Sequence, residues 1–480
     1  MATLIAVDLG NESGRVYKVH FDGAKLSGAE VYRFANEPVT VRGALTWDVL
    51  RLWHDIQLGL SAALPERPDG IGVASFGVDF GLLDQRGDLI SNPLHMRNSR
   101  EAMLAWVNER IPLQEVFRRT GIAPHVINTL FQLAALQQDA PWQLEAAHAL
   151  LTMPNLINYW LTGEIASEFT HSTTTQCFNP FLMDWDGYLL QQCGIPREIF
   201  PNIVQAGEQI GQYQGVPVYA VASHDTGSAV LAVPTETEDF AYISSGTWSL
   251  LGIETRAPVI NDAAYQAGIT SEGGAFGTFR PLKLVMGMWL IQQCRATWRA
   301  QGGETDYRVL LAQAESAPPL TALIDPNWPE FLAPGDMPSR IATYCRQTEQ
   351  PIPDGNGAIL RCIMESLALT YRHALEQIIT AANTQVKTFH VVGGGAQNAI
   401  LCQMTADAMN RTVYAGPIEA TAIGNAVAQL IGRGELRDAA EARAVIRASC
   451  PIAEYSPQHT EAWDAAYARY VQLLGNTANQ

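Results

Sequence analysis

The sequence has few cysteines and little positive charge. Its seven cysteines are scattered along 480 residues and form no CxxC pair. This spacing excludes a zinc finger and a secreted disulfide scaffold, so we expect reduced, mostly buried thiols. Lysine and arginine together number 31 against 48 acidic residues, which gives a net charge of −17. We therefore expect neither nucleic acid nor an anionic membrane as a partner, because both require a basic surface.

Long apolar runs and two familiar nucleotide-binding signatures are also missing. No uninterrupted apolar stretch reaches the length of about 18 residues that indicates a membrane helix. The apolar N-terminus is interrupted at Asp8 and Glu12 and lacks the basic start and cleavage site of a signal peptide, so we expect a cytoplasmic protein. Neither GxGxxG nor GxxxxGK[ST] occurs, which argues against a Rossmann dehydrogenase and against a P-loop kinase.

The residues that are present describe an acidic globular chain. Hydrophobic residues make up 47% of it and charged residues 16%, a balance that excludes wholesale disorder. The first hundred residues predict strands at 4–7, 15–19 and 29–34, a helix capped by Asp48, and a strand at 71–74. The order is therefore β-β-β-α-β.

A second start of the same kind lies near the middle of the chain. The expected elements there are strands at 218–222, 241–244 and 249–253, helix 358–382, strand 388–392, helix 398–409 and strand 412–415. We therefore predict an α/β fold of two lobes built on a similar plan, with a cleft between them. The acidic, turn-forming stretch 234–239 is the expected linker, and it divides the chain into domains 1–236 and 237–480.

The first motif that could carry chemistry is the turn from Asp8 to Arg15. Gly10 and Gly14 permit a tight turn with exposed backbone N–H groups, and Asp8 at the strand end can hold a hydrated cation. Together these groups suit a polyphosphate with Mg²⁺. The alternative interpretation is an ordinary hairpin with a surface acid.

Two further turns have the composition of phosphate-binding or nucleotide-binding loops. Residues 244–249 form a hydroxyl-rich turn between strands, which could grip phosphate oxygens. Opposed to the first turn across a cleft, it would clamp a triphosphate. Residues 393–395 are three glycines between a strand and a helix, where an adenine or a phosphate could approach the backbone and the helix N-terminus. Either turn could instead be purely structural.

Asp225 follows the strand predicted at 218–222 and precedes a run of small residues that starts a helix. A carboxylate at the C-terminal end of a strand projects toward a binding crevice in α/β folds. Asp225 could therefore accept the proton of a substrate hydroxyl that attacks phosphorus, and the adjacent His224 could orient the substrate. The alternatives are a helix N-cap for Asp225 and a merely structural histidine.

In combination these segments resemble the FGGY-type carbohydrate kinases of the actin, sugar kinase and heat-shock ATPase superfamily. Within that family the chain is most similar to the rhamnulokinases. The resemblance covers nearly the whole chain and rests on residues 7–10, 13–15, 46–48, 77–79, 222–226, 244–250, 286–289 and 416–420.

This resemblance implies two RNase H-like lobes and transfer of the γ-phosphoryl group of ATP, with Mg²⁺, to the terminal hydroxyl of a ketose. The implied ketose is L-rhamnulose, giving L-rhamnulose 1-phosphate. Asp225 matches the catalytic base. The nucleotide-binding positions are Asn11, Glu12, Ser13, Gly14, Arg15, Thr247, Gln292 and Gly395, and the sugar-binding positions are Gly77, His224, Asp225 and Thr226.

The sequence departs from the rhamnulokinase pattern mainly at sugar-side positions. The departures are Ala74, Ser75 and Phe76 before the glycine, Met96 and Asn98 in place of a tyrosine and an acid, and Leu284 in place of an asparagine. A pocket that has lost polar partners should discriminate differently among ketoses.

Other functions remain open from the sequence. L-fuculose, xylulose or another ketose could be the acceptor, or the fold could serve as a non-catalytic sugar or nucleotide sensor, or as an actin-like polymerising or chaperone ATPase. The sequence leaves open whether the chain is a monomer or a homodimer.

Overall fold

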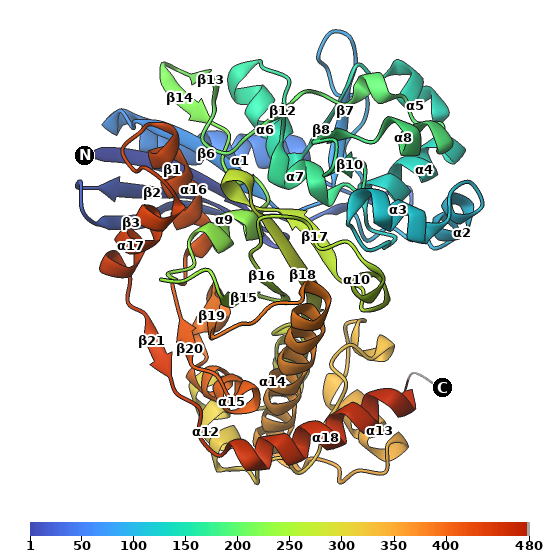
Figure 1. The fold of residues 1–480 in the computed structure, drawn as a ribbon, viewed down its shortest axis with the longest axis vertical. Helices are drawn as coiled ribbons and strands as arrows, with labels where there is room; N and C mark the ends of the chain where they lie inside the picture. Colours follow the sequence, from blue (N-terminus) through green and yellow to red (C-terminus); the bar gives the residue numbers. More distant parts are fainter. Residues whose placement is uncertain (478–480) are drawn as a thin grey trace. The chain divides into compact units, whose positions relative to one another are not determined.

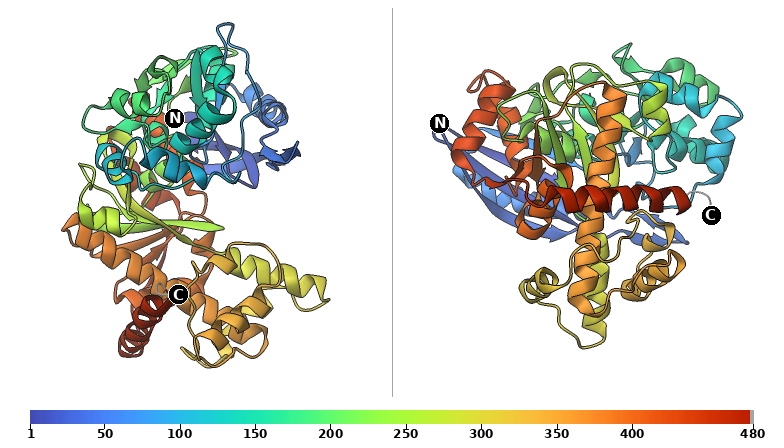
Figure 2. Two further views of the ribbon diagram at one scale, coloured as in Figure 1. Left: turned by 90° about the vertical axis from the view of Figure 1, so that its right-hand side faces the viewer. Right: turned by 60° about the horizontal axis from the view of Figure 1, so that its bottom comes forward.

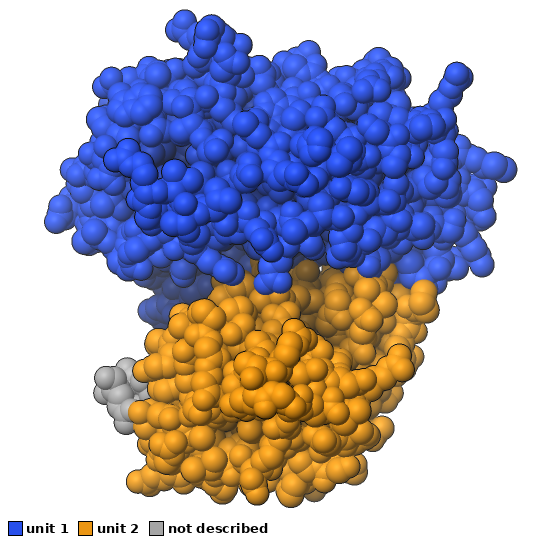
Figure 3. Space-filling view, turned by 180° about the vertical axis from the view of Figure 1, so that it is seen from behind, with its two compact units in different colours: residues 1–236, 254–282, 419–450 blue, residues 237–253, 283–418, 451–480 orange. Residues whose placement is uncertain are grey.

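The computed structural model describes residues 1–477 and divides the chain into two compact units. The first contains residues 1–236, 254–282 and 419–450, and the second contains residues 237–253, 283–418 and 451–480 (Figure 3). Both units are therefore discontinuous in sequence, whereas the sequence predicts a single boundary after residue 236. The chain first passes from one unit to the other within the expected linker.

The first unit is built on a six-stranded sheet in the order β13-β14-β6-β1-β2-β3. Strand β1 pairs antiparallel with β2 and parallel with β6. The strands of this sheet are β1 (Ala2–Leu9), β2 (Ser13–Phe21), β3 (Leu26–Ala35), β6 (Gly70–Ser75), β13 (Gln209–Tyr213) and β14 (Val216–Tyr219). The predicted β-β-β-α-β order is confirmed, with the small hairpin of β4 (Val39–Val41) and β5 (Ala44–Thr46) inserted before the helix.

Other elements of the first unit surround this sheet. Its longer helices are α1 (Val49–Ala63), α2 (Ala102–Asn108), α3 (Leu113–Thr120), α4 (Thr129–Asp139), α6 (Met153–Thr162), α9 (Asp225–Leu231), α16 (Ala420–Gly432) and α17 (Ala439–Ser449). Its short helices are α5 (Pro141–Ala146), α7 (Phe169–Thr174), α8 (Gly187–Gln192) and α10 (Asp262–Gln266). Its remaining strands are β7 (Phe80–Leu83), β8 (Ala149–Thr152), β9 (Ser167–Glu168), β10 (Phe178–Asn179), β11 (Asp184–Trp185), β12 (Ile203–Val204), β17 (Thr270–Gly273) and β18 (Phe279–Met286), whose end passes into the second unit.

The two faces of strand β1 bury different side chains, because successive residues of a strand point to opposite sides. Ile5, Val7 and Leu9 belong to the apolar core that includes residues of α1 and α6. The opposite face, which carries Asp8, packs against α16. Figure 1 shows this red helix beside the dark blue strands, although some 400 residues separate them. Gln429 of α16 donates to the carbonyl of Ile5 at 3.1 Å.

The second unit repeats this plan. Its sheet has the order β16-β15-β19-β20-β21, with β15 antiparallel to β16 and parallel to β19. The strands are β15 (Phe240–Ser245), β16 (Trp248–Ile253), β19 (Thr388–Val392), β20 (Val413–Ala415) and β21 (Ala453–Tyr455). The helices are α11 (Trp289–Ala300), α12 (Tyr307–Ser316), α13 (Met337–Gln347), α14 (Gly355–Ala382), α15 (Ala399–Met409) and α18 (Thr460–Thr477).

Local sequence signals account for several element boundaries. Asp48 caps α1 by accepting the backbone N–H of Arg51 at 3.2 Å, as predicted. The predicted strand 218–222 ends earlier, at Tyr219.

In the second unit α18 crosses the long α14 (Figure 2), where the hydroxyls of Thr370 and Tyr470 lie 2.8 Å apart. All seven cysteines are free thiols and six of them are buried, as expected.

Helix α16 approaches α9 closely because residue 424 has no side chain. A Cβ added to Gly424 would lie 1.8 Å from the backbone oxygen of Ser228 in α9.

Within residues 1–477, no helix is long and apolar enough to cross a membrane.

We predict that Gly424→Ala destabilises the first unit. Alanine normally favours a helix interior over glycine by about 1 kcal/mol, but here the new Cβ must push the two helices apart. We expect a net loss of about 1–3 kcal/mol in the free energy of unfolding, measured by chemical denaturation. Gly187→Ala is the matched control, because nothing lies within 4 Å of its added Cβ. Equal stability of the two variants would contradict the prediction.

Candidate active site

Asp225 is the first residue of α9, and its carboxylate is held by the next residue. Its Oδ1 accepts the backbone N–H of Thr226 at 2.6 Å and the hydroxyl of Thr226 at 3.3 Å. The side chain is 29% exposed. The N-cap position belongs to His224, so the alternative interpretation of Asp225 as an N-cap is wrong. A fixed, partly exposed carboxylate can accept a proton from a bound hydroxyl.

Asp8 lies on the face of β1 that packs against α16, and it is buried. Its Oδ2 accepts Nε of Arg15 at 2.9 Å from the neighbouring strand. Burial raises the pKa of Asp8 to about 6 against the lowering effect of Arg15, and the negative charges of Asp225 and Glu419 raise it further. Both predicted carboxylates belong to the first unit, and Asp225 is near enough to raise the pKa of Asp8.

Arg15 also bonds to Glu419, which the motif analysis left without a role. The guanidinium donates through NH1 to Oε2 of Glu419, the residue directly before α16. Arg15 thus joins two carboxylates in this structure. Glu419 belongs to the motif 416–420 that contributed to the family resemblance, and this was the only signal for it in the sequence.

The turn between β1 and β2 lies where the sequence predicts it. Its glycines, however, are not explained by the backbone conformation of a tight turn. Neither Gly10 nor Gly14 has a positive φ. A Cβ at Gly14 would lie 2.3 Å from the ring of Phe34, so glycine is required there for packing. Asn36 fixes the turn, because its backbone N–H donates to the carbonyl of Glu12 and its amide donates to that of Gly10. Asn11 and Glu12 are exposed.

His224 is surrounded by three charged groups, two of which, Glu272 and Arg280, sequence reasoning missed. Its Nδ1 lies 3.0 Å from Oε2 of Glu272 and 3.0 Å from a guanidinium nitrogen of Arg280, and its Nε2 lies 3.4 Å from Oδ1 of Asp225. Glu272 and Arg280 are opposite each other on β17 and β18. The only signal in the sequence was a charged residue, Arg280, inside the apolar run 279–282.

Gly77 lies next to His224, another of the residues predicted to contact the sugar. A Cβ at Gly77 would lie 3.4 Å from Nε2 of His224. The following residue, Val78, has a φ of +69°, which is strained for a β-branched residue. Its carbonyl accepts the hydroxyl of Thr129 at 2.6 Å, and this bond helps to hold the strained loop in place.

Asp79 anchors the same loop through a buried network. Its carboxylate accepts Nε1 of Trp47 at 2.7 Å, the backbone N–H of Met96 at 3.1 Å and Nε2 of Gln132 at 2.9 Å. Burial raises the pKa of Asp79 to about 6, although these three hydrogen bonds lower it.

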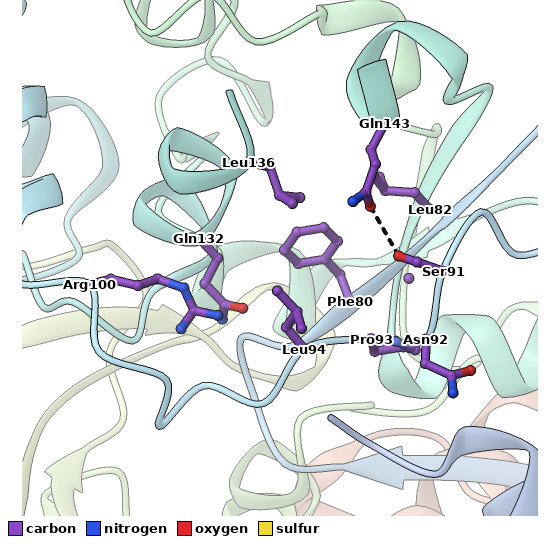
Figure 4. Close-up of a pocket in the computed structure, with 11 residues that line it drawn as sticks. Phe80, Leu82, Ser91, Asn92, Pro93, Leu94, Arg100, Gln132, Leu136 and Gln143 are labelled. Atoms are coloured by element: carbon purple, nitrogen blue, oxygen red, sulfur yellow. Dashed lines mark hydrogen bonds between the residues drawn. The ribbon is translucent and has the colours of Figure 1, made fainter. Parts of the chain in front are cut away.

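A cavity of about 350 Å³, including open space at its mouth, adjoins this network through Gln132. In Figure 4 the ring of Phe80 lies among leucine side chains, and a hydrogen bond joins Ser91 to Gln143. The cavity is lined by Phe80, Gly81, Leu82, Ser91, Asn92, Pro93, Leu94, Arg100, Gln132, Leu136 and Gln143. None of them is among the predicted site residues.

Two departures from the rhamnulokinase pattern have structural roles. Phe76 is buried and stacks on Trp47 with ring centroids 4.6 Å apart. Asn98 ties backbone groups together, because its amide donates to the carbonyls of Leu45 and His95 and its oxygen accepts the N–H of Leu45. Both N–H groups of the Asn98 side chain are thus used within the protein, whereas Leu284 is 47% exposed.

In the second unit the predicted nucleotide residues gather at the turn between β15 and β16. Nε2 of Gln292 donates to the hydroxyl of Thr247 at 3.3 Å. A Cβ at Gly395 would lie 2.0 Å from the hydroxyl oxygen of Ser245, so the glycine permits a close approach to the same turn. Three predicted positions from distant parts of the sequence are thus neighbours.

The glycine turn after β19 corrects one expectation. The chain does not pass directly into a helix with a free N-terminus. A short 3₁₀ turn, Gly394–Gln397, intervenes, and the side chain of Asn398 caps α15 by accepting the N–H of Leu401 at 3.1 Å. A ligand at this turn would therefore meet glycine backbone and not an uncapped helix end.

Glu168 is a fully buried carboxyl beneath the loop that carries Asp225. Its Oε2 accepts the hydroxyl of Thr170 at 2.6 Å and the backbone N–H groups of His171 and Ser223 at 3.2 and 3.1 Å. Its Oε1 has no hydrogen-bond partner. Burial raises its pKa from 4.5 to about 7, because the ionised form is poorly solvated there.

We predict that Glu168 makes the free energy of unfolding fall as pH rises from about 4.5 to about 7. In this window the folded state binds the proton more tightly than the unfolded state, so raising the pH favours unfolding. Glu168→Gln preserves the three bonds to Oε2 and removes the titration, so denaturation at a series of pH values should give a shallower slope. Glu198→Gln, at an exposed acid, is the control. An unchanged slope in Glu168→Gln would disprove this assignment.

Comparison with known proteins adds independent findings. Residues 3–222 match the N-terminal domain of the FGGY family of carbohydrate kinases, and residues 241–432 match its C-terminal domain. The chain is 42% identical to a rhamnulokinase of Bacteroides thetaiotaomicron, with 97% of this chain and 98% of the relative covered. It is 40% identical to a rhamnulokinase of Enterococcus faecalis, with 94% of each covered.

Solved structures show the same fold at low sequence identity. A ligand-bound xylulose kinase from Lactobacillus acidophilus has a TM-score of 0.84 at 16% identity and covers 100% of this chain and 99% of its own. A xylulose kinase from Rhodospirillum rubrum has a TM-score of 0.82 at 18% identity, with 99% of both chains covered. The expected α/β class with two RNase H-like lobes is confirmed.

Proposed function

Because the chain belongs to the FGGY family of carbohydrate kinases, we propose that it transfers the γ-phosphoryl group of ATP to the terminal hydroxyl of L-rhamnulose, giving L-rhamnulose 1-phosphate and ADP. The observation that carries the proposal is the identity of 40–42% to two rhamnulokinases over nearly the whole chain. The family is defined by sugar phosphorylation, and ATP is the donor in sugar kinases of this kind.

We assign the role of general base to Asp225. The hydroxyl oxygen of the sugar forms a bond to the γ-phosphorus, and the bond from that phosphorus to the bridging oxygen breaks, with its electron pair leaving on ADP. The hydroxyl proton passes to the carboxylate of Asp225. The fixed Oδ1 at the start of α9 supports this role. Most of the rate acceleration then comes from positioning and charge stabilisation, as in other phosphoryl transfers.

The sugar-binding role is proposed for Gly77, His224 and Thr226. Their support is proximity, since Gly77 lies beside Nε2 of His224 and Thr226 bonds to Asp225. The loop at Val78 is strained and held by buried hydrogen bonds, an arrangement typical of a preorganised binding site. Leu284 offers no polar partner, so a sugar hydroxyl near it would lack the hydrogen bond that asparagine could make at this position.

Nucleotide binding is proposed for the turn residues of both units. In the first these are Asn11, Glu12, Ser13, Gly14 and Arg15, and in the second they are Thr247, Gln292 and Gly395. The gathering of the last three at one turn supports their assignment.

Asp8 is the residue we propose to hold Mg²⁺. No group of three or more metal-binding side chains exists within residues 1–477, which fits an ion that usually binds one or two carboxylates together with substrate phosphates and water. The donor set fits, because the carboxylates of Asp8, Asp225 and Glu419 outnumber the one cation among them, Arg15, and the excess negative charge attracts a divalent cation. The bound ion would supply charge neutralisation for the phosphate oxygens. We also propose a cytoplasmic location and a monomeric or homodimeric state.

A coupled assay of ADP release over a panel of ketoses tests the proposed substrate. We expect kcat/KM to be highest for L-rhamnulose, with L-fuculose and xylulose as the comparison sugars. ADP release that does not depend on any sugar would contradict the assignment of a sugar kinase, and a clear preference for another ketose would overturn only the assignment of L-rhamnulose.

We predict that Asp225→Asn lowers kcat about a hundredfold or more, because the amide cannot take the hydroxyl proton. The KM for ATP should stay near the wild-type value, since the proposed ATP contacts are elsewhere in the chain. Steady-state kinetics with L-rhamnulose measure both quantities. Asp184→Asn, an exposed carboxylate of the same unit, serves as control. Full sugar-dependent turnover by Asp225→Asn would remove Asp225 from the role of base.

A further inference from the structure

Arg280 is fully buried beside the proposed active site, and nothing in the proposed mechanism uses it. Its Nε donates to the carbonyl of Gly273 at 2.8 Å, and one terminal nitrogen donates to Oε2 of Glu272 at 3.0 Å. The same terminal nitrogen lies 3.0 Å from Nδ1 of His224 with hydrogen-bond geometry. A buried guanidinium is costly unless its charge is compensated, which Glu272 does here.

The contact between Arg280 and His224 bears on where the ring proton lies, since Nδ1 is 3.0 Å both from this donor and from an acceptor, Oε2 of Glu272. A guanidinium has only donors, so Nδ1 of His224 must offer its lone pair to receive a bond from Arg280. A neutral imidazole with an unprotonated Nδ1 carries its hydrogen on Nε2. Nε2 is the atom that lies 3.4 Å from Oδ1 of Asp225 and next to Gly77.

The opposite arrangement is less favourable in this geometry. If Glu272 accepted a hydrogen from Nδ1, a neutral ring would turn an unprotonated Nε2 toward the carboxylate of Asp225. Two lone pairs facing each other at that distance repel, whereas an N–H group faces a carboxylate favourably.

We infer that Arg280 is a positioning residue for the phosphoryl transfer: it holds His224 in the tautomer whose Nε2–H faces Asp225 and the proposed sugar position at Gly77. This inference rests on the proposed function. In this form His224 donates a hydrogen bond to a sugar oxygen or to the base itself, and so fixes the hydroxyl against Asp225. The distance of 3.4 Å is longer than an ordinary N–H···O bond, which leaves Nε2–H available to a bound sugar.

Side chains from four elements surround His224 and fix the orientation of its ring. They are Asp225 of α9, Glu272 of β17, Arg280 of β18 and His171 of α7, whose ring centroid lies 6.0 Å away. Burial lowers the pKa of His171 to about 3, so this second ring adds no positive charge. Its Nε2 donates to the carbonyl of Phe76 at 2.9 Å, which fixes its tautomer as well.

The direct test is nitrogen NMR of the wild-type enzyme labelled with ¹⁵N at histidine. The signals of His224 are assigned by their loss in His224→Asn, and spectra are recorded well above the ordinary pKa of histidine. We expect His224 to show a protonated Nε2 and an unprotonated Nδ1. A protonated Nδ1 would overturn the inference. This measurement needs no turnover, so its result stands apart from the success or failure of the proposed function.

Kinetics of Arg280→Ala provide a second test. We expect kcat with L-rhamnulose to fall about tenfold to a hundredfold, because a misplaced contact group costs this much in rate, while the KM for ATP stays unchanged. Added guanidinium ion at low millimolar concentration should restore part of kcat by refilling the vacated site. A folded variant with wild-type kcat would overturn the inference.

Arg119→Ala is the matched control, because Arg119 also pairs with a buried carboxylate, that of Asp186, and has no contact with His224. It should lose stability but keep its kcat, with or without guanidinium ion. If Arg280→Ala does not fold, the tautomer seen in the wild-type spectrum decides. If the wild type phosphorylates no ketose, the proposed function fails while the spectrum still reports the role of Arg280.

Discussion

The site in the first unit depends on how closely α16 packs against its neighbours. Gly424 removes the side chain that would collide with Ser228 of α9, and Gly70 and Gly72 of β6 remove those that would collide with Gln429 and Asn425 of α16. Because none of these three residues has a side chain, the start of α16 can lie beside the end of β1 and the start of α9. Asp8, Glu419 and Asp225 are the residues at those ends, so packing places the charged groups together.

Placing charge in this way has a cost for the folded state. Asp8, Asp79 and Glu168 are all buried carboxyl groups whose pKa is raised by burial. A sequence selected for stability alone would replace them with apolar groups, because buried charge is retained at an energetic cost. We interpret them as parts of a buried polar network beside the partly exposed Asp225, in which hydrogen bonds and charges act more strongly than in water.

The sequence predicted most of the framework because the signals for the elements are local. The apolar run in β1, the cap at Asp48 and the strand 388–392 all appear in the structure where the pattern indicates them. The family resemblance was also informative, since the three positions that it assigns to nucleotide binding in the second unit, Thr247, Gln292 and Gly395, are neighbours. The structural role of a glycine was less predictable. Gly14 is required because the ring of Phe34, on the neighbouring strand, leaves no room for a side chain.

Long-range contacts of single charged residues could not be predicted. Glu272 and Arg280 reach His224 only because β17 and β18 form a hairpin beside α9, and Glu419 reaches Arg15 across 404 residues. Asn98 shows the converse, since a substitution that suggests altered sugar binding in fact ties backbone groups together. Such pairings depend on the tertiary fold, and a single sequence does not show which residues they join.

The most direct test of this account is a crystal structure of the enzyme with L-rhamnulose and a non-hydrolysable ATP analogue. The account places the terminal hydroxyl of the sugar within hydrogen-bond distance of the Asp225 carboxylate, with Nε2 of His224 in contact with the same sugar. A well-ordered sugar whose hydroxyl lies away from Asp225, against another acid or base, would contradict it.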